Sequence, residues 1–405
     1  MANHGESPIR FFEMKASDLA GLVTGTFDLK PHAQSVLEPL CRAAQPVSDE
    51  AGRLSGDPAL RKALGILSMP DHTMRIRIGG GAMGFEEATL CHAAAQGQPL
   101  ALFGGTDDGN RLVALFADAA TFVDWWTAQY GGKNADTVPN PVPPKTTLGE
   151  FLMVLHAIDS FRRVSYENML AYVSAAEPVI SLKQYLETFS AAIRSRDIRW
   201  LLPAFLALTP GVETYPAELK ADNAQILVRL GLAAFVGHPK TGEGMLAFSG
   251  NLRSIGSAFF RSWMFAAGFE ILSVSTAGRQ AYGSFFLAPT ALANHFVRLE
   301  TDASGATLAN HQTYTASQLR DRMLGLLQEM TALPAPAAAA AAPVSSAPTA
   351  AAAAPVSSAP AAPVAPPSPE NGKASAAYCH KCGNPLRPEE RFCVSCGTPR
   401  AEKKG

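Results

Sequence analysis

Residues 1 to about 331 carry alternating helical and strand-like patterns of apolar residues. In the segment HTMRIRIGG, residues 72–80, apolar residues at 74, 76 and 78 alternate with arginines at 75 and 77. Side chains alternate between the two faces of a strand, so one face is predicted to be buried and the other to meet solvent or charged partners. Parallel strands covered by helices on both faces would be apolar throughout. The pattern therefore predicts antiparallel sheets packed on helices.

The same region contains what we interpret as a diverged internal repeat. In the first half, a helix ending DPALRKALGILSMP is followed by HTMRIRIGG, EEATLCHAAAQGQ, PLALFGGTDDG and NRLVALFADAATFVDWW. In the second half, a helix ending NAQILVRLGLAAFV is followed by GEGMLAFSG, SIGSAFFRSWMFAAG, FEILSVSTAGR and QAYGSFFLAPTALANHFVRL. Each half predicts a helix, about four strands and a helix, with further helices over 148–163, 166–174 and 182–208. The alternative is an ordinary α+β chain that aligns loosely with itself.

The predicted fold class is α+β. It consists of a duplicated helix–antiparallel sheet–helix domain with halves 1–145 and 146–331, a disordered Ala/Pro linker over 332–377 and a C-terminal zinc ribbon over 378–400. Residues 332–369 contain no charge and consist almost entirely of Ala, Pro and Ser, and PVSSAP at 343–348 recurs at 355–360. Proline interrupts helices and alanine buries little, so this segment is predicted to stay extended and solvated.

The tail YCHKCGNPLRPEERFCVSCGTPR holds two Cys-x-x-Cys pairs separated by ten residues, and a glycine follows each pair. Zinc binds four thiolates at the corners of a tetrahedron, and each Cys-x-x-Cys turn offers two of them. The predicted ligands of a structural Zn²⁺ are Cys379, Cys382, Cys393 and Cys396. Because four thiolates leave no coordination position for water or substrate, the site is predicted to hold structure and not to catalyse.

This tail resembles the short bacterial zinc-ribbon family, whose pattern is Cys-Pro-x-Cys-Gly, a spacer, and Phe-Cys-x-x-Cys-Gly. The resemblance covers about 23 residues and implies the same four ligands, with Gly383 and Gly397 at the glycine positions of the family. His380 stands where the family usually has proline, and Val394 departs likewise, but neither is a ligand.

Charge gives little support for a polyanionic partner. The chain has 34 Lys and Arg against 35 Asp and Glu, so no overall field favours nucleic acid or an anionic membrane. From residue 371 onward, seven basic residues face three acidic ones. The surplus is four, and a zinc ion with four thiolates subtracts two. The remaining charge of two weakly supports nucleic-acid binding by the ribbon.

The start, MANHGESPIRFFEMKASDLAGLV, has no apolar run of signal-peptide length. The most apolar stretch, residues 259–272, is interrupted by Arg261 and Glu270 and is too short to span a bilayer. A cytoplasmic protein with no membrane partner is therefore expected. Cys41 and Cys91 lie in apolar surroundings and are predicted to be core thiols.

Residues 79–84 match the dinucleotide pattern G-x-G-x-x-G after a strand, and the acidic Asp107 and Asp108 follow farther on. The alternating strand before it and the helical region upstream favour a turn instead. H-E-x-x-H, G-x-x-x-x-G-K-[ST] and G-x-S-x-G do not occur in the sequence, and the histidines lack metal-ligand spacing. The chain is therefore predicted not to be an enzyme.

The run DPALRKALGILSMPDHTMRIRIGG, continuing to QPLALFGGTDDGNRLVALFADAATFVDWW, is similar in order and spacing to the EspG-like chaperones associated with ESX (type VII) secretion. In that family an Asp-Pro-x-Leu helix leads through an Ala/Leu-Pro turn to strands and a closing helix. The resemblance implies a pseudo-two-fold antiparallel sheet with helical bundles and a role in binding a client protein. A zinc-ribbon tail departs from the plan of that family.

These observations predict a zinc-binding, non-enzymatic intracellular adaptor or chaperone-like protein that binds a protein partner. The alternative is a nucleic-acid-associated regulator that uses the zinc ribbon. No small-molecule ligand follows from the sequence.

Overall fold

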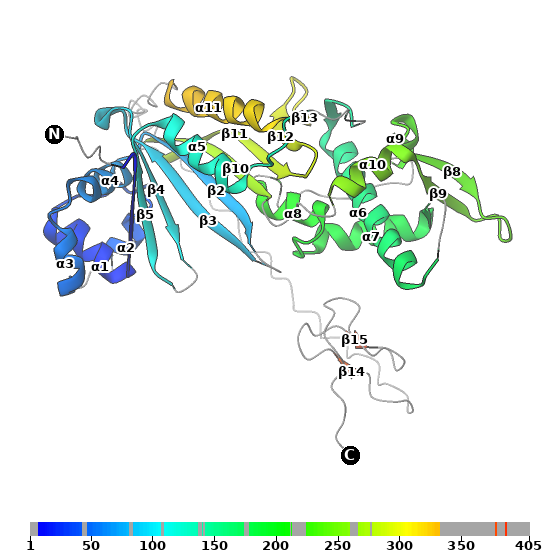
Figure 1. Ribbon diagram of the computed structural model, residues 1–405, viewed down its shortest axis with the longest axis horizontal. Helices are drawn as coiled ribbons and strands as arrows, with labels where there is room; N and C mark the ends of the chain where they lie inside the picture. Colours follow the sequence, from blue (N-terminus) through cyan, green and yellow to red (C-terminus); the bar gives the residue numbers. More distant parts are fainter. Residues whose placement is uncertain are drawn as a thin grey trace, which may run out of the picture. The chain divides into compact units, whose positions relative to one another are not determined.

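The computed structural model describes residues 7–42, 47–80, 84–106, 109–136, 140, 142–173, 178–210, 212, 224–259, 266–275, 278–332, 377–378 and 385–386. The chain divides into two compact units, Met1–Ala342 and Pro343–Gly405. The larger unit is built on a ten-stranded sheet in the order β1-β5-β4-β3-β2-β10-β11-β12-β13-β6 (Figure 1). Its strands are β1 Ile9–Met14, β2 His72–Gly80, β3 Gly84–His92, β4 Leu100–Gly105, β5 Arg111–Phe116, β6 Lys145–Thr147, β10 Ala267–Ser275, β11 Gly278–Pro289, β12 Asn294–Thr301 and β13 Thr307–Tyr314.

Neighbouring strands of this sheet pair antiparallel, as the sequence predicts. The alternation along β2 separates a buried apolar face from a charged face, as the sequence predicts. Met74 and Ile76 are buried on one face, while Arg75 on the other face pairs with Glu87 of β3 and Glu270 of β10. One strand thus serves both an apolar core and a charged surface.

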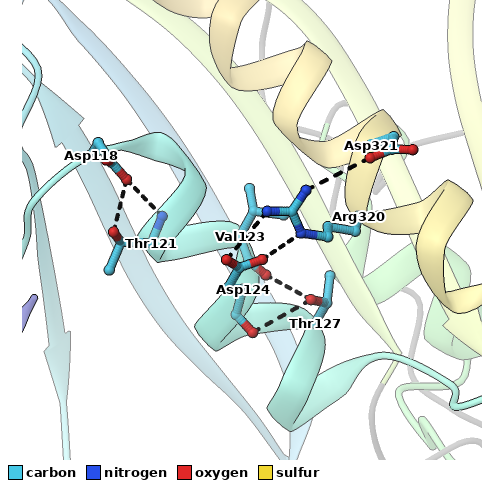
Figure 2. Close-up of polar contacts among 7 residues, drawn as sticks. All are labelled: Asp118, Thr121, Val123, Asp124, Thr127, Arg320 and Asp321. Atoms are coloured by element: carbon cyan, nitrogen blue, oxygen red, sulfur yellow. Dashed lines mark hydrogen bonds and ion pairs between the residues drawn. The ribbon is translucent and has the colours of Figure 1, made fainter.

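Two helices cover the face of the sheet that carries Met74 and Ile76. They are α5 Ala119–Tyr130 and α11 Ala316–Ala332, which lie side by side in Figure 1. Asp118 begins α5, because its carboxylate accepts a hydrogen bond from the backbone N–H of Thr121. The two helices are joined at their surface by an ion pair between Arg320 and Asp124, and Figure 2 shows this pair.

The opposite face is covered over its first half by four short helices, α1 Ala16–Gly21, α2 Glu38–Cys41, α3 Asp49–Leu54 and α4 Pro58–Ser68. We call this set the α1–α4 group. Asp57 begins α4 by accepting hydrogen bonds from the N–H groups of Ala59 and Leu60. Apolar residues of the group pack on side chains of β3, β4 and β5, so the core of the group is shared with the sheet.

The second half of that face meets a larger set, which we call the α6–α10 lobe. It contains α6 Leu148–Leu170, α7 Leu182–Arg194, α8 Leu201–Leu208, α9 Gln225–Arg229, α10 Gly250–Ala258 and a separate three-stranded sheet in the order β7-β9-β8, with β7 Val179–Ser181, β8 Ala233–Gly237 and β9 Gly244–Phe248. Helix α8 lies directly on the central sheet at Gly268, where a Cβ atom would stand 1.8 Å from the carbonyl oxygen of Leu208. Glycine is required there by close backbone approach.

Three local predictions for the second half are wrong. Residues 254–268 were expected to include a strand, but 250–258 form helix α10, which Ser249 begins through a hydrogen bond to the N–H of Leu252. The segment AAFV was expected to end a helix and instead forms β8, whereas residues 244–248 form a strand as expected, β9 of the small sheet. The segment QAYGSFFLAPTALANHFVRL was expected to include the closing helix of the second half, but it belongs to the two strands β11 and β12. The sequence repeat as we aligned it therefore does not follow the strand order of the central sheet.

Among the described residues, no helix combines the length and the apolar content needed to cross a bilayer. In the smaller unit, the described residues form a two-stranded antiparallel pair, β14 Ala377–Tyr378 and β15 Pro385–Leu386. The predicted linker lies outside the described residues between 333 and 376.

Candidate partner-binding surfaces and the zinc-ribbon segment

Helix α6 changes character along its length. Thr147 and Glu150 form a reciprocal capping box at its start, and the residues from 151 to 162 are buried. From Tyr166 onward the side chains turn to solvent. Tyr166, Met169 and Leu170 follow the spacing i, i+3, i+4 and so lie along one side of the last turn of the helix, and Val173 follows beyond the helix end. Such a stripe normally packs against a core, but here its side chains are exposed.

The exposed fractions at this helix end are large. Leu170 is 77% exposed, Met169 is 62% exposed and Tyr172 is 97% exposed. Soluble proteins rarely leave several large apolar side chains of one segment uncovered, and such patches mark interaction sites. We call Tyr166, Met169, Leu170, Tyr172 and Val173 the α6-end surface.

Tyr172 also has an unusual backbone. Its φ of 54° is in the left-handed region, where glycine is the usual residue. The N–H of Val173 donates to the carbonyl of Asn168 at 2.8 Å, and the N–H of Tyr172 donates to that of Met169 at 3.2 Å. These two bonds form a Schellman motif, in which the left-handed position follows the end of the helix. The chain thus holds an exposed tyrosine at a position where glycine would be more stable.

The α6–α10 lobe carries most of the exposed apolar side chains. Of the thirteen exposed large apolar residues in the described part of the chain, nine lie between residues 166 and 236. They are Tyr166, Met169, Leu170, Tyr172, Val173, Val179, Val228, Phe235 and Val236. Phe235 and Val236 belong to β8, which pairs only with β9 among the described strands and forms an edge of the small sheet.

Beneath this surface, a buried carboxylate of α6 is hydrogen-bonded to the start of α8. The Asp159 carboxylate lies 3.1 Å from Arg162 and accepts hydrogen bonds from the N–H groups of Leu201 and Leu202 at 2.8 and 2.9 Å. Burial raises the pKa of Asp159 to about 6, against the opposing effects of Arg162 and the two N–H groups. The Arg162 guanidinium lies over the Trp200 ring.

A buried histidine pair lies where the lobe meets the second half of the central sheet. His295 Nδ1 and His311 Nε2 are 3.1 Å apart, and Asn140 contacts the other ring nitrogen of His311 at 3.0 Å. Burial lowers the pKa of His311 to about 4, and burial together with His311 lowers the pKa of His295 well below its ordinary value. Both rings are therefore neutral at pH 7, and among the described residues no third metal-ligating side chain joins them.

The glycine-rich segment 79–84 connects two strands of one hairpin, since Gly80 of β2 pairs with Gly84 of β3. A dinucleotide site needs a helix whose N-terminus follows the glycines. Here a strand follows them, which agrees with the turn interpretation. Asp107 and Asp108 lie outside the described residues.

The prediction of core thiols is confirmed for Cys91, which is buried as a free thiol whose pKa burial raises to about 12. Cys41 is also a free thiol but is only partly buried. Burial and, secondarily, Glu38 raise its pKa.

The four predicted zinc ligands, Cys379, Cys382, Cys393 and Cys396, lie outside the described residues. The described part of the tail nevertheless fits a zinc ribbon. Tyr378 pairs with Pro385, so the first Cys-x-x-Cys pair falls between two paired strands. The donor set of four thiolates suits a tetrahedral Zn²⁺.

The comparison with protein-family models agrees with the zinc-ribbon prediction for the tail. Residues 378–400 match the model of the zinc-ribbon domain. The match indicates zinc binding by the tail, at the boundaries that the sequence predicts. A search of curated proteins gave no match to the chain. The resemblance of the first half to EspG-like chaperones therefore stays a prediction.

Sequence reasoning did not identify the α6-end surface. The spacing of its apolar residues is that of a core-facing helix, so the sequence alone places them inside. The only sequence signal for exposure is the tyrosine two residues after α6 ends, where a helix stop normally shows glycine or asparagine.

Proposed function

We propose that this chain is a cytoplasmic, non-enzymatic adaptor that binds a protein partner through the α6-end surface and uses its zinc ribbon as a second contact. The observation that carries the proposal is the exposed apolar stripe Tyr166, Met169 and Leu170 together with the adjacent Tyr172. The i, i+3, i+4 spacing of the stripe fits an apolar groove of a partner, which would cover these positions together. Tyrosine and methionine are enriched in the centres of such interfaces.

The backbone at Tyr172 supports the same proposal. A non-glycine residue in the left-handed region costs about 1 kcal/mol or more. The fold would lose nothing by having glycine there, because the side chain is almost fully exposed. A tyrosine kept at this position is therefore expected to act outside the fold, in contact with another molecule.

For the tail, we propose that Cys379, Cys382, Cys393 and Cys396 together hold one structural Zn²⁺. A domain of about 23 residues cannot bury enough apolar surface to fold alone, so the metal would supply the folding energy. The uncharged Ala/Pro segment before it would act as a tether. At a flexible-coil span of about 36 Å for the 44 residues 334–377, the ribbon would stay near a partner held by the larger unit at a roughly millimolar effective concentration.

We also infer that the central sheet arose by internal duplication. Support comes from the strand order, which runs β1-β5-β4-β3-β2 in one half and β6-β13-β12-β11-β10 when the other half is counted inward from its own edge. Each half then contains an edge strand, helices, a four-stranded meander and a closing helix, α5 or α11. The α6–α10 lobe would be the elaborated counterpart of the α1–α4 group.

The proposal is tested by quantitative affinity capture with the full chain in extracts of the cells that produce it. The test variant is Leu170→Glu combined with Tyr172→Ser, and the matched control is Met69→Glu, which alters an exposed methionine of the first half. We expect at least one protein to be retained about tenfold less by the test variant and equally by the control, because loss of a central apolar contact costs about 1.4 kcal/mol or more.

A third protein lacking residues 332–405 separates the roles of the two units. If the ribbon supplies a second contact, the same partner binds this truncated chain more weakly but detectably. Identical capture by the wild-type chain, the test variant and Met69→Glu would refute the role of the α6-end surface. Metal analysis of the full chain should give one zinc per chain, lost in Cys393→Ser.

A further inference from the structure

Between the α1–α4 group and α8, a strip of the central sheet keeps a polar surface and holds a cavity of about 300 Å³. Strands β2, β3, β4, β5, β10 and β11 contribute to its lining. The lining residues are Val36, Thr73, Arg75, Glu87, Thr89, Phe103, Gly104, Gly105, Arg111, Leu272 and Arg279. We call this strip the arginine groove.

The lining carboxylate Glu87 and the neighbouring Glu270 are already engaged by Arg75 of the lining and the neighbouring Arg77. Glu87 lies 2.9 Å from Arg75 and 3.6 Å from Arg77, and Glu270 lies 3.1 Å from Arg75. These four residues balance in charge, two positive and two negative. They leave the remaining arginines of the groove without an acidic partner among the described residues.

Those remaining arginines are Arg111 and Arg279. Arg279 donates a hydrogen bond to the carbonyl oxygen of Gln34 at 2.7 Å, which is a neutral acceptor. Arg111 Nε is buried and has no hydrogen-bond partner within the described part of the chain. The Arg111 guanidinium lies close to Gly105, where an added Cβ atom would be 3.1 Å from Nη1. A buried, unpartnered guanidinium nitrogen costs free energy unless an acceptor from outside satisfies it.

The spacing of the two arginines limits what that acceptor can be. Arg111 is on β5 and Arg279 is on β11, and the sheet order places five strand spacings between them. At about 4.8 Å per spacing, their backbones are roughly 24 Å apart across the strands, and Arg279 is also displaced along β11 from the residue level with Arg111, Phe286. Two arginine side chains cannot converge on one small anion over that distance. A ligand that engages both must be extended and must carry negative charge at two separated points.

We propose that the arginine groove binds an extended acidic peptide segment of a partner protein, with one carboxylate of the peptide meeting Arg111 and another meeting Arg279. An extended chain advances about 3.3 Å per residue, so about seven residues cross the groove. Glu87 in the lining and Glu270 beside it disfavour a continuous phosphate backbone, and the lining residues lack the basic run that nucleic acid requires. This site lies on elements other than the α6-end surface and adds a further contact to the two of the proposed function, the α6-end surface and the zinc ribbon.

The test uses fluorescence anisotropy with the full chain and labelled seven-residue peptides of Gly and Ser. One peptide has Glu at both ends, one has two adjacent Glu in the middle, and one has Gln at both ends. We expect the first to bind most tightly, with an affinity that falls as salt rises, and the Gln peptide to bind about tenfold or more weakly. Equal binding of the end-Glu and Gln peptides would overturn the proposal.

The variants are Arg111→Gln, Arg279→Gln and, as a matched control, Arg196→Gln, which changes an exposed arginine of the α6–α10 lobe. Each of the first two should weaken binding of the end-Glu peptide about tenfold, and the control should leave it unchanged. Glu87→Gln should tighten binding severalfold, because it removes a negative charge from the lining of the groove and so reduces repulsion of the acidic peptide. If Arg111 only supported the fold, Glu87→Gln would not tighten binding of the end-Glu peptide while Arg111→Gln weakens it.

A single-stranded oligonucleotide serves as the competing ligand. If it displaces the end-Glu peptide at a lower concentration than unlabelled peptide does, the groove is a nucleic-acid site and the proposal is wrong. Thermal unfolding of each variant shows that the fold is retained. Because the peptide is measured directly, failure here is separate from failure of the α6-end surface in affinity capture.

Discussion

The α1–α4 group and the α6–α10 lobe lie on the same face of the central sheet, but they bury their apolar side chains differently. In the α1–α4 group, Leu60 and Leu64 share one core with Ala101 and Val113 of the sheet. In the lobe, most of the core lies among α6, α7, α8 and the small sheet, and strands of the central sheet supply only its edge. The lobe therefore reaches beyond the sheet and can leave apolar positions free for another protein.

Both sets use an aspartate to begin the helix that packs on the sheet. Asp57 lies at the N-cap of α4 itself and pairs with Arg10, whose side chain is 42% exposed. Asp159 instead comes from α6, reaches the start of α8 and pairs with Arg162 in full burial. The first contact is local and hydrated, whereas the second joins two helices inside a core. Removing the two carboxylates should therefore lower the free energy of unfolding by unequal amounts.

The largest effect is expected for Asp159→Asn. At pH 7 this change removes the negative charge and leaves Arg162 buried without its ionic partner, which costs about 3–5 kcal/mol of unfolding free energy. Asp57→Asn is the matched change in the α1–α4 group. Because asparagine is also a good N-cap and the Arg10 pair is partly exposed, it should cost about 1 kcal/mol or less. Urea unfolding at pH 7 measures both, and equal losses would contradict the contrast.

The sequence predicts the α1–α4 half of the molecule better than the lobe, for a physical reason. The alternation in β2 is local, so the antiparallel sheet and its two-sided chemistry follow from neighbouring residues. The Asp-Pro start of α4 is also a local signal. By contrast, the partner N–H groups of Asp159 are more than forty residues away, and no local pattern indicates them.

The candidate sites show the same contrast between features that a local sequence pattern predicts and features that depend on the whole fold. The tail was predicted with its boundaries because its ligand spacing is short and its chemistry is restricted to cysteine. The α6-end surface was missed because exposure is a property of the whole fold, and apolar periodicity is the same in a covered and an uncovered helix. For the arginine groove, the alternation in β2 predicts only that Arg75 lies on the polar face of the strand. Arg111 and Arg279 join it only through the strand order.

An acid-dependent loss of stability is expected from the second half of the sheet, where His295 and His311 lie against the lobe. Their folded pKa values are lowered, to about 4 for His311, whereas the unfolded value is about 6.5. Between these limits the unfolded chain binds more protons, so stability is present above pH 6.5 and is lost as pH falls. Each histidine contributes about 1.4 kcal/mol per pH unit, or about 3 kcal/mol for His311 over the window.

Asp159 acts in the opposite direction in part of this window. Its folded pKa of about 6 is above the unfolded value of about 3.9, so its contribution falls as pH rises from 4 to 6. The test is therefore a difference between two proteins. Urea unfolding of the wild-type chain and of His311→Gln from pH 7 to pH 4 should show a slope smaller by about 1.4 kcal/mol per pH unit in the variant. An unchanged slope would show that His311 does not titrate as its burial requires.

The smallest effect, and the one that separates binding from folding, is expected at Tyr172. Tyr172→Gly relieves the left-handed strain at the end of α6 and should raise the unfolding free energy by about 1 kcal/mol. Tyr172→Ala is the control, because it removes the same exposed ring but keeps a residue with a Cβ atom at φ 54°. Its stability should stay close to that of the wild-type chain. If the α6-end surface binds a partner, both variants bind it more weakly, although one is more stable than the wild-type chain. A loss of stability in Tyr172→Gly would mean that the tyrosine ring supports the fold, and the argument from strain to binding would then fail.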